Sequence, residues 1–592
     1  MFRITGPPLT KQKGTSVSIH NADIARTLDA MADLLEIEGA NPFRVRAYRN
    51  ASRVVETQSR EIRTLIDENF DLTSLPGIGP DLAGKIREIA RSGTLAELQK
   101  RETETPPSLL ELLKIPGLGP ARVRALHSEL GIKTVDELRA AARSGRIERL
   151  KGFGKKSALR ILDSLREFHG EPSRFRIDVA DQYARPLLSF LEKAPGVLQA
   201  SIAGSLRRRK ETVGDLDMVV SARPGSPVMD RFLHYEEVRE VVSHGETRST
   251  VLLNSGLQVD LRVVSGESFG SALYYFTGSK SHNIAVRRLG QALGLKINEY
   301  GVFRGKERIG GKTEDSVFNA VRLATIPPEL RENQGEIEAA QSGTLPSLIE
   351  RKDLRGDLHS HTSLTDGQNT LQEMTRAALA RGFEYLGVTE HSRRLGMAHG
   401  LDSERTLKNV EAIRELDEQL KGLALLAGME VDILPDGSLD LPDSVLSRLD
   451  LVIGAVHSDF TLSREKQTSR ILRAMDNPFL TILAHPGGRH IGERPPMEID
   501  WTRLIRHAKD RRTILEINGQ PSRLDLTEVY ARMAKEEGVL MAINSDSHST
   551  DQFDNLDYGI GQARRGWITK ENIVNTRPLA ELKRIFGGIR LI

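Results

Sequence analysis

The spacing of apolar residues divides the chain into a helical front, a mixed middle and a rear in which strands and helices alternate. In residues 18–70 apolar side chains recur at the period of amphipathic helices, beginning with Ile24, Leu28, Met31, Leu34 and Leu35. Around residues 202–264, acids lie inside short apolar runs, a pattern that predicts strands beside a polar site. From Asp353 onward, strand-like apolar runs alternate with helical patterns, which predicts an α/β domain.

The helical front contains three glycine turns, each of which opens a helix. They lie at residues 75–80, 115–120 and 150–155 and carry the pairs Gly77 and Gly79, Gly117 and Gly119, and Gly152 and Gly154. Paired glycines free backbone N–H groups at a helix N-terminus, where they can hold a phosphate oxygen without reading base sequence. One such turn could be a plain connection between helices. Three of them beside cations such as Lys155 resemble helix-hairpin-helix DNA-binding motifs.

The middle of the chain contains a candidate site for two metal ions and a phosphate. A Gly-Ser turn at 204–205 is followed by four cations at 207–210. Asp215 and Asp217 lie two residues apart in an apolar run, so both carboxylates emerge on one face of a strand. Asp260 adds a third carboxylate from a second apolar run, and three acids beside a phosphate cradle describe two-metal nucleotidyl transfer. The alternative is a solvated turn with ordinary surface charge.

Composition and charge narrow the classes to which the protein can belong. Its 592 residues suffice for several domains, because single cores stop growing near about 250–300 residues. The lack of cysteine excludes disulfides and thiolate metal sites, so a transition metal needs His and carboxylate ligands. No apolar run approaches a membrane span and the start is unlike a signal peptide, which favours a cytosolic protein. The net charge is +6 over residues 1–170, +2 over 171–352 and −5 over 353–592, which favours polyanion binding at the front.

In the rear third, seven apolar runs end in polar or charged side chains. Their ends are marked by His361, His391, Glu430, His457, His485, Asn518 and His548. Parallel strands that each deliver a polar group at the carboxyl end are typical of an α/β barrel with its active site on that face. The pattern therefore predicts a distorted (β/α)7 barrel. A lone buried histidine is usually a hydrogen-bonded core residue, but six histidines at strand ends with acids between them indicate a metal site.

The glycine turns and the Gly-Ser…Asp-x-Asp pattern together make residues 18–322 resemble a family X DNA polymerase of the polymerase-beta type. The resemblance implies an N-terminal domain, fingers, palm and thumb. It places Arg44 and Tyr48 near the 5′-phosphate of a gap, and Lys85 where the family's deoxyribose-phosphate lyases carry their Schiff-base lysine. Asp81 stands where such lyases have another lysine, and a carboxylate opposes the lowered pKa that a Schiff base needs. Lys85 can equally be a phosphate contact.

The same resemblance assigns the catalytic and nucleotide-binding residues of the palm and thumb. Asp215, Asp217 and Asp260 would hold two Mg²⁺ ions, or Mn²⁺, and Asp260 would help activate the primer 3′-hydroxyl. The other implied contacts are Gly204, Ser205 and Arg208 at the triphosphate, and Tyr275, Phe276, Gly278, Asn283 and Arg287 at the sugar and base pair. The two aromatic side chains would disfavour a 2′-hydroxyl, although an aromatic turn packed into a core would have the same sequence.

The rear third resembles the polymerase-and-histidinol-phosphatase (PHP) domain over residues 353–592. The resemblance implies nine metal ligands: His359, His361, Asp366, His391, Glu430, His457, His485, Asp546 and His548. Nine ligands are too many for one ion, and the resemblance implies three, Mn²⁺ or Zn²⁺ with iron as a further choice. Such ions would bind a phosphate ester and lower the pKa of a bridging water. Arg489 and Arg523 are candidate phosphate contacts or, alternatively, part of a charged rim.

The two resemblances cover nearly the whole chain and match the PolX arrangement of bacteria and archaea. The expected parts are a flexible tail (1–17), an N-terminal helix-hairpin-helix domain (18–98), fingers (99–172), palm (173–266), thumb (267–325), linker (326–352) and PHP domain (353–592). The implied function is gap filling in DNA repair, with Mn²⁺-dependent 3′→5′ exonuclease, 3′-phosphatase and abasic-site endonuclease activity in the barrel. The implied partners are gapped or nicked DNA and deoxynucleoside triphosphates, for a cytoplasmic, nucleoid-associated monomer without membrane contact.

Two other interpretations stay open from the sequence alone. One is a nucleotidyltransferase for a small molecule or tRNA with a free-standing phosphatase domain, against which the DNA-type turns and the Tyr275-Phe276 segment argue. The other is a DNA-binding scaffold with one decayed site, which would leave a PHP nuclease or phosphatase with weak or no polymerase activity. All three palm acids and all nine barrel ligands are present, which argues against decay.

Overall fold

The computed structural model describes residues 19–56, 58, 61–104, 107–113, 115, 118–147, 150, 153, 161 and 174–589. Its contacts divide the chain into two compact units. One unit contains Met1–Ser173 with His234–Glu240 and Leu252–Gly256, and the other contains Arg174–Leu233, Val241–Val251 and Leu257–Ile592. Within these described ranges no helix is long and apolar enough to cross a membrane. The predicted DNA contacts Gly117, Gly152, Gly154 and Lys155 lie outside the described residues.

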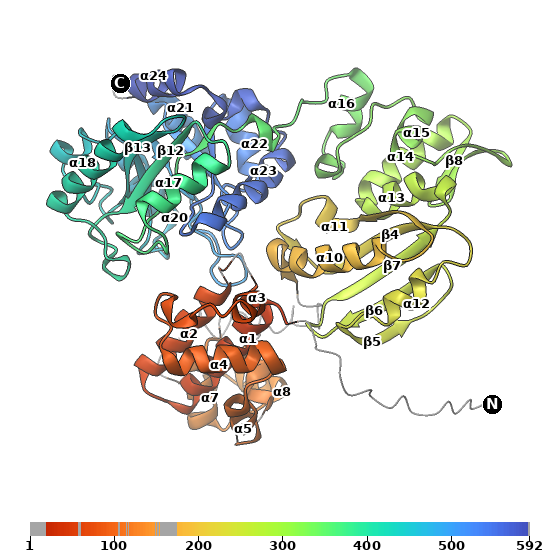
Figure 1. Ribbon diagram of the computed structural model, residues 1–592, viewed down its shortest axis with the longest axis horizontal. Helices are drawn as coiled ribbons and strands as arrows, with labels where there is room; N and C mark the ends of the chain where they lie inside the picture. Colours follow the sequence, from red (N-terminus) through yellow and green to blue (C-terminus); the bar gives the residue numbers. More distant parts are fainter. Residues whose placement is uncertain are drawn as a thin grey trace. The chain divides into compact units, whose positions relative to one another are not determined.

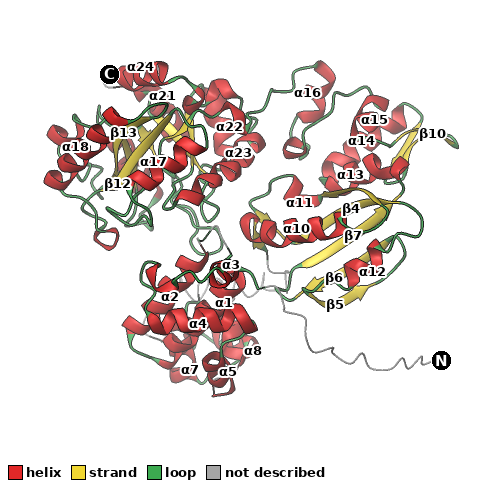
Figure 2. Ribbon diagram, viewed as in Figure 1, coloured by secondary structure: helices red, strands yellow, loops and turns green. Residues whose placement is uncertain are grey.

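The described part of Met1–Ser173 is built from helices (Figure 2). They are α1 (Asn21–Glu38), α2 (Pro42–Glu56), α3 (Ile62–Asp67), α4 (Pro80–Ser92), α5 (Ala96–Glu104), α6 (Pro107–Leu113), α7 (Pro120–Leu130) and α8 (Val135–Arg143). The predicted apolar stripe of α1 is buried in a cluster that also takes side chains from α2 and α4. Gly79 and Gly119 are the N-caps of α4 and α7, and a proline at each first helical position supplies the helical φ in advance.

The palm begins the second unit and is a five-stranded sheet in the order β2-β4-β7-β6-β5. The strands are β2 (Val197–Ile202), β4 (Asp215–Ala222), β5 (Val238–Ser243), β6 (Arg248–Leu253) and β7 (Gln258–Val264). Helices α10 (Ile177–Glu192), α11 (Gly204–Arg207) and α12 (Val228–Leu233) accompany the sheet, and the short strands β1 (Phe175–Arg176) and β3 (Thr212–Val213) pair beside it. Strand β4 lies between β2 and β7 and buries Leu216, Met218, Val219 and Val220, so its acids are carried by a rigid element.

The thumb follows with two helices, a small sheet and a third helix. These elements are α13 (Phe269–Thr277), α14 (Lys280–Ala292), β8 (Leu295–Asn298), β9 (Gly301–Arg304), β10 (Glu307–Gly310) and α15 (Glu314–Ala320). Tyr274, Val286, Val302 and Phe318 form a buried cluster across these elements. Helix α16 (Glu336–Ser342) then lies within the predicted linker.

The rear third forms a seven-stranded parallel barrel, as predicted. The strands follow one another around it in chain order: β11 (Gly356–Asp357), β12 (Tyr385–His391), β13 (Ala424–Asp432), β14 (Leu451–Ala455), β15 (Ile482–Leu483), β16 (Ile514–Asn518) and β17 (Met541–Asn544). The helices are α17 (Leu371–Ala380), α18 (Ser403–Gln419), α19 (Asp443–Leu446), α20 (Arg464–Met475), α21 (Trp501–Arg511), α22 (Glu528–Glu537), α23 (Leu556–Arg565) and α24 (Leu579–Ile589), and Figure 1 shows them arranged around the strands.

The two ends of the barrel sheet are joined by side chains as well as backbone. Asn575 donates from its amide to the carbonyl oxygens of Gly356 in β11 and Ile543 in β17, at 2.9 and 2.7 Å. A parallel bridge between Ser360 and Ser547 continues the contact beyond the strand ends. Because β11 and β17 are short, these polar contacts complete a nearly closed barrel and hold the ligand-bearing segments together.

Candidate functional site

The palm brings its three predicted acids together at one end of two adjacent strands. In the parallel pairing of β4 with β7, Asp217 lies directly opposite Asp260, and Asp215 lies two residues earlier on β4. Asp260 accepts hydrogen bonds from Thr250 Oγ1 at 2.6 Å and Gln258 Nε2 at 2.8 Å, which fix its orientation. Burial, together with Asp215 and Asp260, raises the pKa of Asp217 to about 7. A hard divalent cation would relieve this repulsion between carboxylates, so the donor set fits Mg²⁺.

Position 204 requires glycine because the backbone there lies close to Asp217. Its φ is +61°, and a Cβ at this position would lie 2.2 Å from Asp217 Oδ2. Any side chain would therefore push against a carboxylate of the metal site, in a backbone conformation that residues other than glycine rarely adopt. The predicted phosphate turn and the predicted metal acids are thus parts of one structure.

The cations of the palm turn are engaged by carboxylates that the sequence analysis did not single out. Arg207 pairs with Glu314, whose other cation is the buried Arg331 at 2.6 Å. Arg208, the predicted triphosphate contact, donates to Glu332 at 3.1 Å and to the carbonyl oxygen of Thr277 at 2.5 Å. Glu314 and Glu332 lie more than a hundred residues after the arginines that they bind. No local sequence pattern could therefore have identified these pairs.

The thumb places the predicted aromatic pair beside the palm acids. The rings of Tyr275 and Phe276 meet edge to face with centroids 5.2 Å apart, and Arg262 of β7 stacks on Phe276 at 4.7 Å. Asn283 is buried and donates its amide to the carbonyl oxygen of Tyr275 at 2.7 Å. In this structure Asn283 therefore supports the aromatic segment, and its contact with a base pair stays a prediction. Arg287 is exposed, as a contact to DNA requires.

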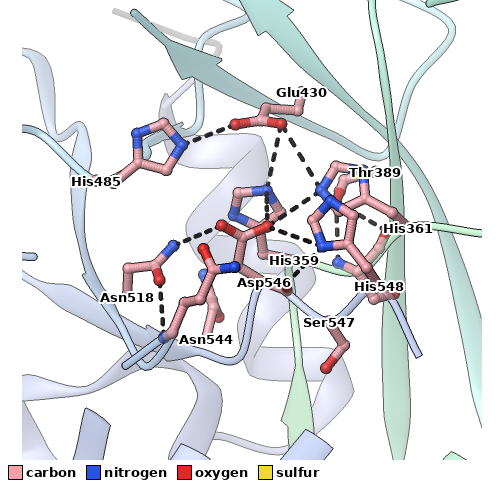
Figure 3. A network of polar contacts seen from close by, with 12 residues as sticks. His359, His361, Thr389, Glu430, His485, Asn518, Asn544, Asp546, Ser547 and His548 are labelled. Carbon is pink, nitrogen blue, oxygen red and sulfur yellow. Dashed lines mark hydrogen bonds and ion pairs between the residues drawn. The ribbon is translucent and has the colours of Figure 1, made fainter. Parts of the chain in front are cut away.

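The nine predicted ligands of the barrel gather at the carboxyl ends of its strands. Figure 3 shows His359, His361, Glu430, His485, Asp546 and His548 of this set. The set forms three groups whose ligand atoms lie within 4.8 Å of one another: His361, Asp366, His391 and His548; His359, His361 and Asp546; and His391, Glu430 and His457. The ninth, His485, lies 2.9 Å from Glu430 through its Nε2. Strand register explains part of the grouping, because His391 of β12 pairs directly with Glu430 of β13.

Buried nitrogen atoms without partners indicate that this barrel site fits metal ions. His361 Nδ1 and His485 Nδ1 are buried and have no hydrogen-bond partner in the described part of the chain. His359 Nε2 lies 3.6 Å from both Glu430 and Asp546, which is too long for a hydrogen bond. Buried polar atoms of this kind cost free energy unless they are satisfied, and imidazole and carboxylate donors suit Mn²⁺, Zn²⁺ or iron.

The electrostatics of the barrel site separate its histidines. Burial, followed by the charges of His391 and His548, lowers the pKa of His361 to about 3, so this ring is neutral and ready to bind a metal. Burial would also lower the pKa of His391, but Glu430 and Asp366 outweigh it and raise that pKa to about 10. Protonated rings such as His391 neutralise the carboxylates in this structure, a role that metal ions would take over with release of protons.

Glu516 supports the barrel site and was not predicted as a functional residue. This fully buried carboxylate accepts from His359 Nδ1 at 2.7 Å and from the backbone N–H of His485 at 2.8 Å. It also accepts from the amides of Asn518 and Asn544, at 3.0 and 2.9 Å. An acid inside the apolar run of β16 was the sequence signal that could have found it. A carboxylate behind a ligating histidine fixes the orientation of its ring.

The two arginines that were expected to contact phosphate have different partners in the structure. Arg523 lies 3.7 Å from Asp546 and so stands at the ligand cluster. Arg489 instead donates both of its terminal nitrogens to Glu211 of the palm, at 3.2 and 2.6 Å. A phosphate contact at Arg489 stays a prediction, and it would require this ion pair with Glu211 to open. Two ligand residues, His485 and Asp546, have positive φ, a costly conformation that clusters at functional sites.

In the helical unit, the predicted 5′-phosphate contacts converge on one glutamate. Arg44 lies 2.5 Å and Lys85 3.1 Å from the carboxylate of Glu97, and the Tyr48 hydroxyl donates to it at 3.3 Å. Burial alone would lower the pKa of Lys85, but hydrogen bonds, led by that to Asp81 at 2.7 Å, outweigh it and raise the pKa. A Schiff-base lysine needs the opposite shift, so this environment favours Lys85 as an anion contact.

Comparison with known proteins identifies the family. The models described as "Helix-hairpin-helix domain", "SAM-like Helix-hairpin-helix tandem", "DNA polymerase beta thumb" and "PHP domain" match residues 19–95, 109–167, 272–332 and 357–545. A Bacillus subtilis protein named "DNA polymerase/3′-5′ exonuclease PolX" is 36% identical over 569 residues, which are 95% of this chain and 99% of the relative. The chain belongs to the PolX family. It is thus a family X DNA polymerase with a C-terminal PHP domain.

Other relatives match a smaller part of the chain. A probable phosphatase of Thermoanaerobacter sp. is 30% identical over 250 residues, which are 39% of this chain and 97% of the relative. A probable phosphatase of Acetivibrio thermocellus is 28% identical over 211 residues, or 34% of this chain and 82% of the relative. PolX membership makes this chain a metal-dependent enzyme, with the palm acids and the barrel histidines as its two candidate ligand sets.

Proposed function

We propose that the chain fills short gaps in DNA during repair and that its barrel processes 3′ ends. The barrel activities are a Mn²⁺-dependent 3′→5′ exonuclease and a 3′-phosphatase, with abasic-site cleavage as a further reaction of the same centre. The name of the Bacillus relative supports the polymerase and exonuclease activities, and the names of the smaller relatives support the phosphatase activity. The substrates are gapped or nicked DNA and deoxynucleoside triphosphates, which would keep a monomeric enzyme at the nucleoid.

In the palm, the chain's own residues position the nucleotide and the primer end. Asp215, Asp217 and Asp260 would hold Mg²⁺ or Mn²⁺, which supplies Lewis-acid polarisation of phosphoryl oxygens and neutralises developing charge. Asp260 is oriented by Thr250 and Gln258 and is the acid assigned to help activate the primer 3′-hydroxyl. The backbone of Gly204, the hydroxyl of Ser205 and the guanidinium of Arg208 bind the triphosphate. Tyr275 and Phe276, with Gly278 beyond them, limit the space around the sugar.

In the barrel, the nine ligands hold ions that, when bound, would activate water and polarise a phosphate ester. Glu516 keeps the His359 ring oriented toward the centre of the cluster. Arg523, 3.7 Å from Asp546, adds a positive charge that would bind the phosphate of the DNA end. The buried walls around these residues exclude bulk water and strengthen their electrostatic interactions.

One observation carries the proposal: the chain contains two complete and chemically different ligand sets. The palm set consists of carboxylates on two paired strands, which suits Mg²⁺. The barrel set is rich in imidazole and falls into three groups, which suits several transition-metal ions. A scaffold with one decayed site would have no physical reason to keep both sets assembled, down to the glycine that makes room for Asp217.

A labelled DNA with a one-nucleotide gap tests the proposal directly. The full chain is incubated with this DNA and Mn²⁺, with and without nucleotides. The proposal predicts extension by one nucleotide when nucleotides are present and 3′ shortening when they are absent. Shortening without extension would instead support a PHP nuclease on a DNA-binding scaffold. Extension without shortening, on hydroxyl and phosphate 3′ ends alike, would contradict the proposed role of the barrel.

A further inference from the structure

The barrel contacts the second half of the nucleotide turn of the palm, which spans residues 204–211. Arg565 of α23 donates to the backbone carbonyl oxygen of Arg208 at 2.9 Å. Three residues further along the turn, Glu211 receives the guanidinium of Arg489 at 2.6 Å. Between them the backbone of Gly561 packs on Arg209, because a Cβ at 561 would lie 3.2–3.6 Å from that side chain. The turn is thus held by residues of the barrel, through one backbone carbonyl oxygen and two side chains.

The carboxylate of Glu332 joins the same contact from the segment after the thumb. Its Oε1 lies 3.1 Å from Arg208 Nε, 3.1 Å from Arg565 Nη1 and 3.5 Å from Lys210 Nζ. The side chain of Arg565 is only 3% exposed and that of Glu332 14%, so these charges interact with little solvent screening. Glu528 of α22 accepts from the other terminal nitrogen of Arg565 at 3.0 Å. Three cations thus meet two carboxylates.

These contacts determine where the Arg208 guanidinium points. Its Nε is bound to Glu332, and its Nη1 is bound to the carbonyl oxygen of Thr277, the last residue of α13. Two acceptors in different directions fix the plane of the group, which is the condition for a preorganised anion contact. Glu332 is in turn held by Arg565, which also binds the Arg208 carbonyl oxygen. The orientation of Arg208 is therefore coupled to a barrel residue 357 positions away.

We infer that Arg565 of the barrel is a positioning residue for the nucleotide site of the palm, acting through Glu332 and the Arg208 carbonyl oxygen. This inference rests on the proposed polymerase function and adds a dependence that the separate sites do not imply. A full-length chain in which Arg565 is replaced keeps every palm side chain but loses the support of Arg208. Nucleotide binding then weakens, whereas the chemical step, which depends on Asp215, Asp217 and Asp260, changes little.

The neighbouring Arg564 provides a matched control. It donates to Glu329 at 2.8 Å and to the carbonyl oxygen of Ile349 at 3.0 Å, so it also ties α23 to the segment between thumb and barrel. Within the described part of the chain, Arg564 forms no hydrogen bond or ion pair with Arg208 or Glu332. Loss of Arg564 therefore tests a general weakening of this junction, and loss of Arg565 tests the positioning of Arg208.

The experiment measures KM for the nucleotide and kcat for filling a one-nucleotide gap in full-length Arg565→Gln, Arg565→Lys, Glu332→Gln and Arg564→Gln. We expect KM to rise about tenfold, equivalent to about 1.4 kcal/mol, in Arg565→Gln and Glu332→Gln, with kcat within about threefold of the parent. Arg565→Lys should recover part of the loss, and Arg564→Gln should match the parent. Thermal unfolding and barrel hydrolysis of a small phosphate ester report on folding.

The outcomes separate this inference from the proposed function. An unchanged KM in both Arg565→Gln and Glu332→Gln overturns the inference, and so does an equal rise in Arg564→Gln. If Arg565→Gln fails to fold, Glu332→Gln decides, since it removes the same ion pair without removing the Arg565 contact to the Arg208 carbonyl oxygen. A parent enzyme that shortens DNA but never extends it would contradict the polymerase function itself.

Discussion

The barrel takes its ligands from the ends of six of its seven strands, whereas the palm takes three acids from two neighbouring strands. In the barrel, supporting residues such as Glu516 and Asn518 hydrogen-bond the ligands, and six of the nine ligands are buried, whereas His457 and His548 are half-buried and Asp366 is exposed. In the palm, Asp260 is held by Thr250 and Gln258, but Asp215 is exposed at the start of β4. The barrel therefore completes its site within one domain, whereas the palm leaves an open edge for a nucleotide and a primer.

The two sites also differ in the groups that hold their positively charged side chains. In the barrel, neighbouring carboxylates raise the pKa of His391 and His548, and metal ions would take the place of these protons. In the palm, Arg207 and Arg208 are held by Glu314 and Glu332, which lie outside the palm sheet. We therefore expect the activity of the barrel site to depend mainly on its metal ions. The activity of the palm site should depend also on the segments that orient its side chains.

The largest expected effect is the loss of one activity at a time. Asp217→Asn should slow gap filling about 10³-fold, because an ion that carries several kcal/mol of charge stabilisation loses a shared ligand. His361→Ala should slow barrel hydrolysis to a similar degree, since His361 belongs to two of the three ligand groups. Each variant should keep the other activity, measured on the same gapped DNA. Joint loss in either variant would contradict two separable sites.

The ion pairs of Glu314 should make the palm and thumb sensitive to acid. Burial would raise the pKa of Glu314, but Arg207 and Arg331 outweigh it and lower that pKa to about 2. A lowered pKa contributes stability that is present above the ordinary value near 4.5 and is lost as pH falls toward 2. Glu314→Gln should cost about 3 kcal/mol at pH 7, because the buried Arg331 keeps its charge without a partner.

Thermal unfolding of parent and Glu314→Gln between pH 7 and pH 3 measures this effect. The difference between the two midpoints should be largest at neutral pH and should shrink steadily below pH 4.5. A difference that stays constant down to pH 3 would show that the ionised form of Glu314 is not the stabilising species. Glu373→Gln, at the exposed N-terminus of α17, is a suitable control for the loss of a surface carboxylate.

A smaller effect is expected from the residue behind the barrel ligands. Glu516→Gln keeps the shape of the side chain but removes the charge that orients His359, which should weaken metal binding about 10- to 100-fold. The number of Mn²⁺ ions retained per chain after dialysis, and titration calorimetry with Mn²⁺, measure this change without any reaction. Gap filling by the palm should stay at the parental rate. Parental metal affinity in the variant would mean that the backbone alone orients His359.

The smallest effect concerns Arg44 and Lys85, the predicted 5′-phosphate contacts of the helical unit. Glu97→Gln should free Arg44 and Lys85 for a 5′-phosphate and tighten binding of a gapped DNA up to about fivefold, the scale of partly exposed ion pairs. Fluorescence anisotropy with gapped DNA that carries a 5′-phosphate or a 5′-hydroxyl measures it. An equal gain on both DNAs would show a general charge effect and would contradict a dedicated phosphate pocket.

Local patterns in the sequence predicted the elements, and the family resemblances that they carry predicted most of the candidate site residues. The helical period of the apolar residues and the glycine turns predicted the helices of the front. Histidines after apolar runs predicted a seven-stranded barrel, which the structure confirms. The spacing of Asp215 and Asp217 placed both carboxylates on one face of a strand, and the structure adds that Asp260 lies opposite Asp217. These features are readable because side-chain direction repeats every two residues in a strand and about every 3.6 in a helix.

The tertiary structure alone decided which charges meet. Glu516 gained its role because β11, β15, β16 and β17 bring His359, the His485 N–H, Asn518 and Asn544 around one carboxylate. Arg489 was expected at a phosphate and binds Glu211, while Arg565 reaches Arg208 across most of the chain. Long charged side chains have many rotamers and no periodic signature. Their partners are therefore selected by where the folded backbone places them and by the cost of leaving a buried charge unpaired.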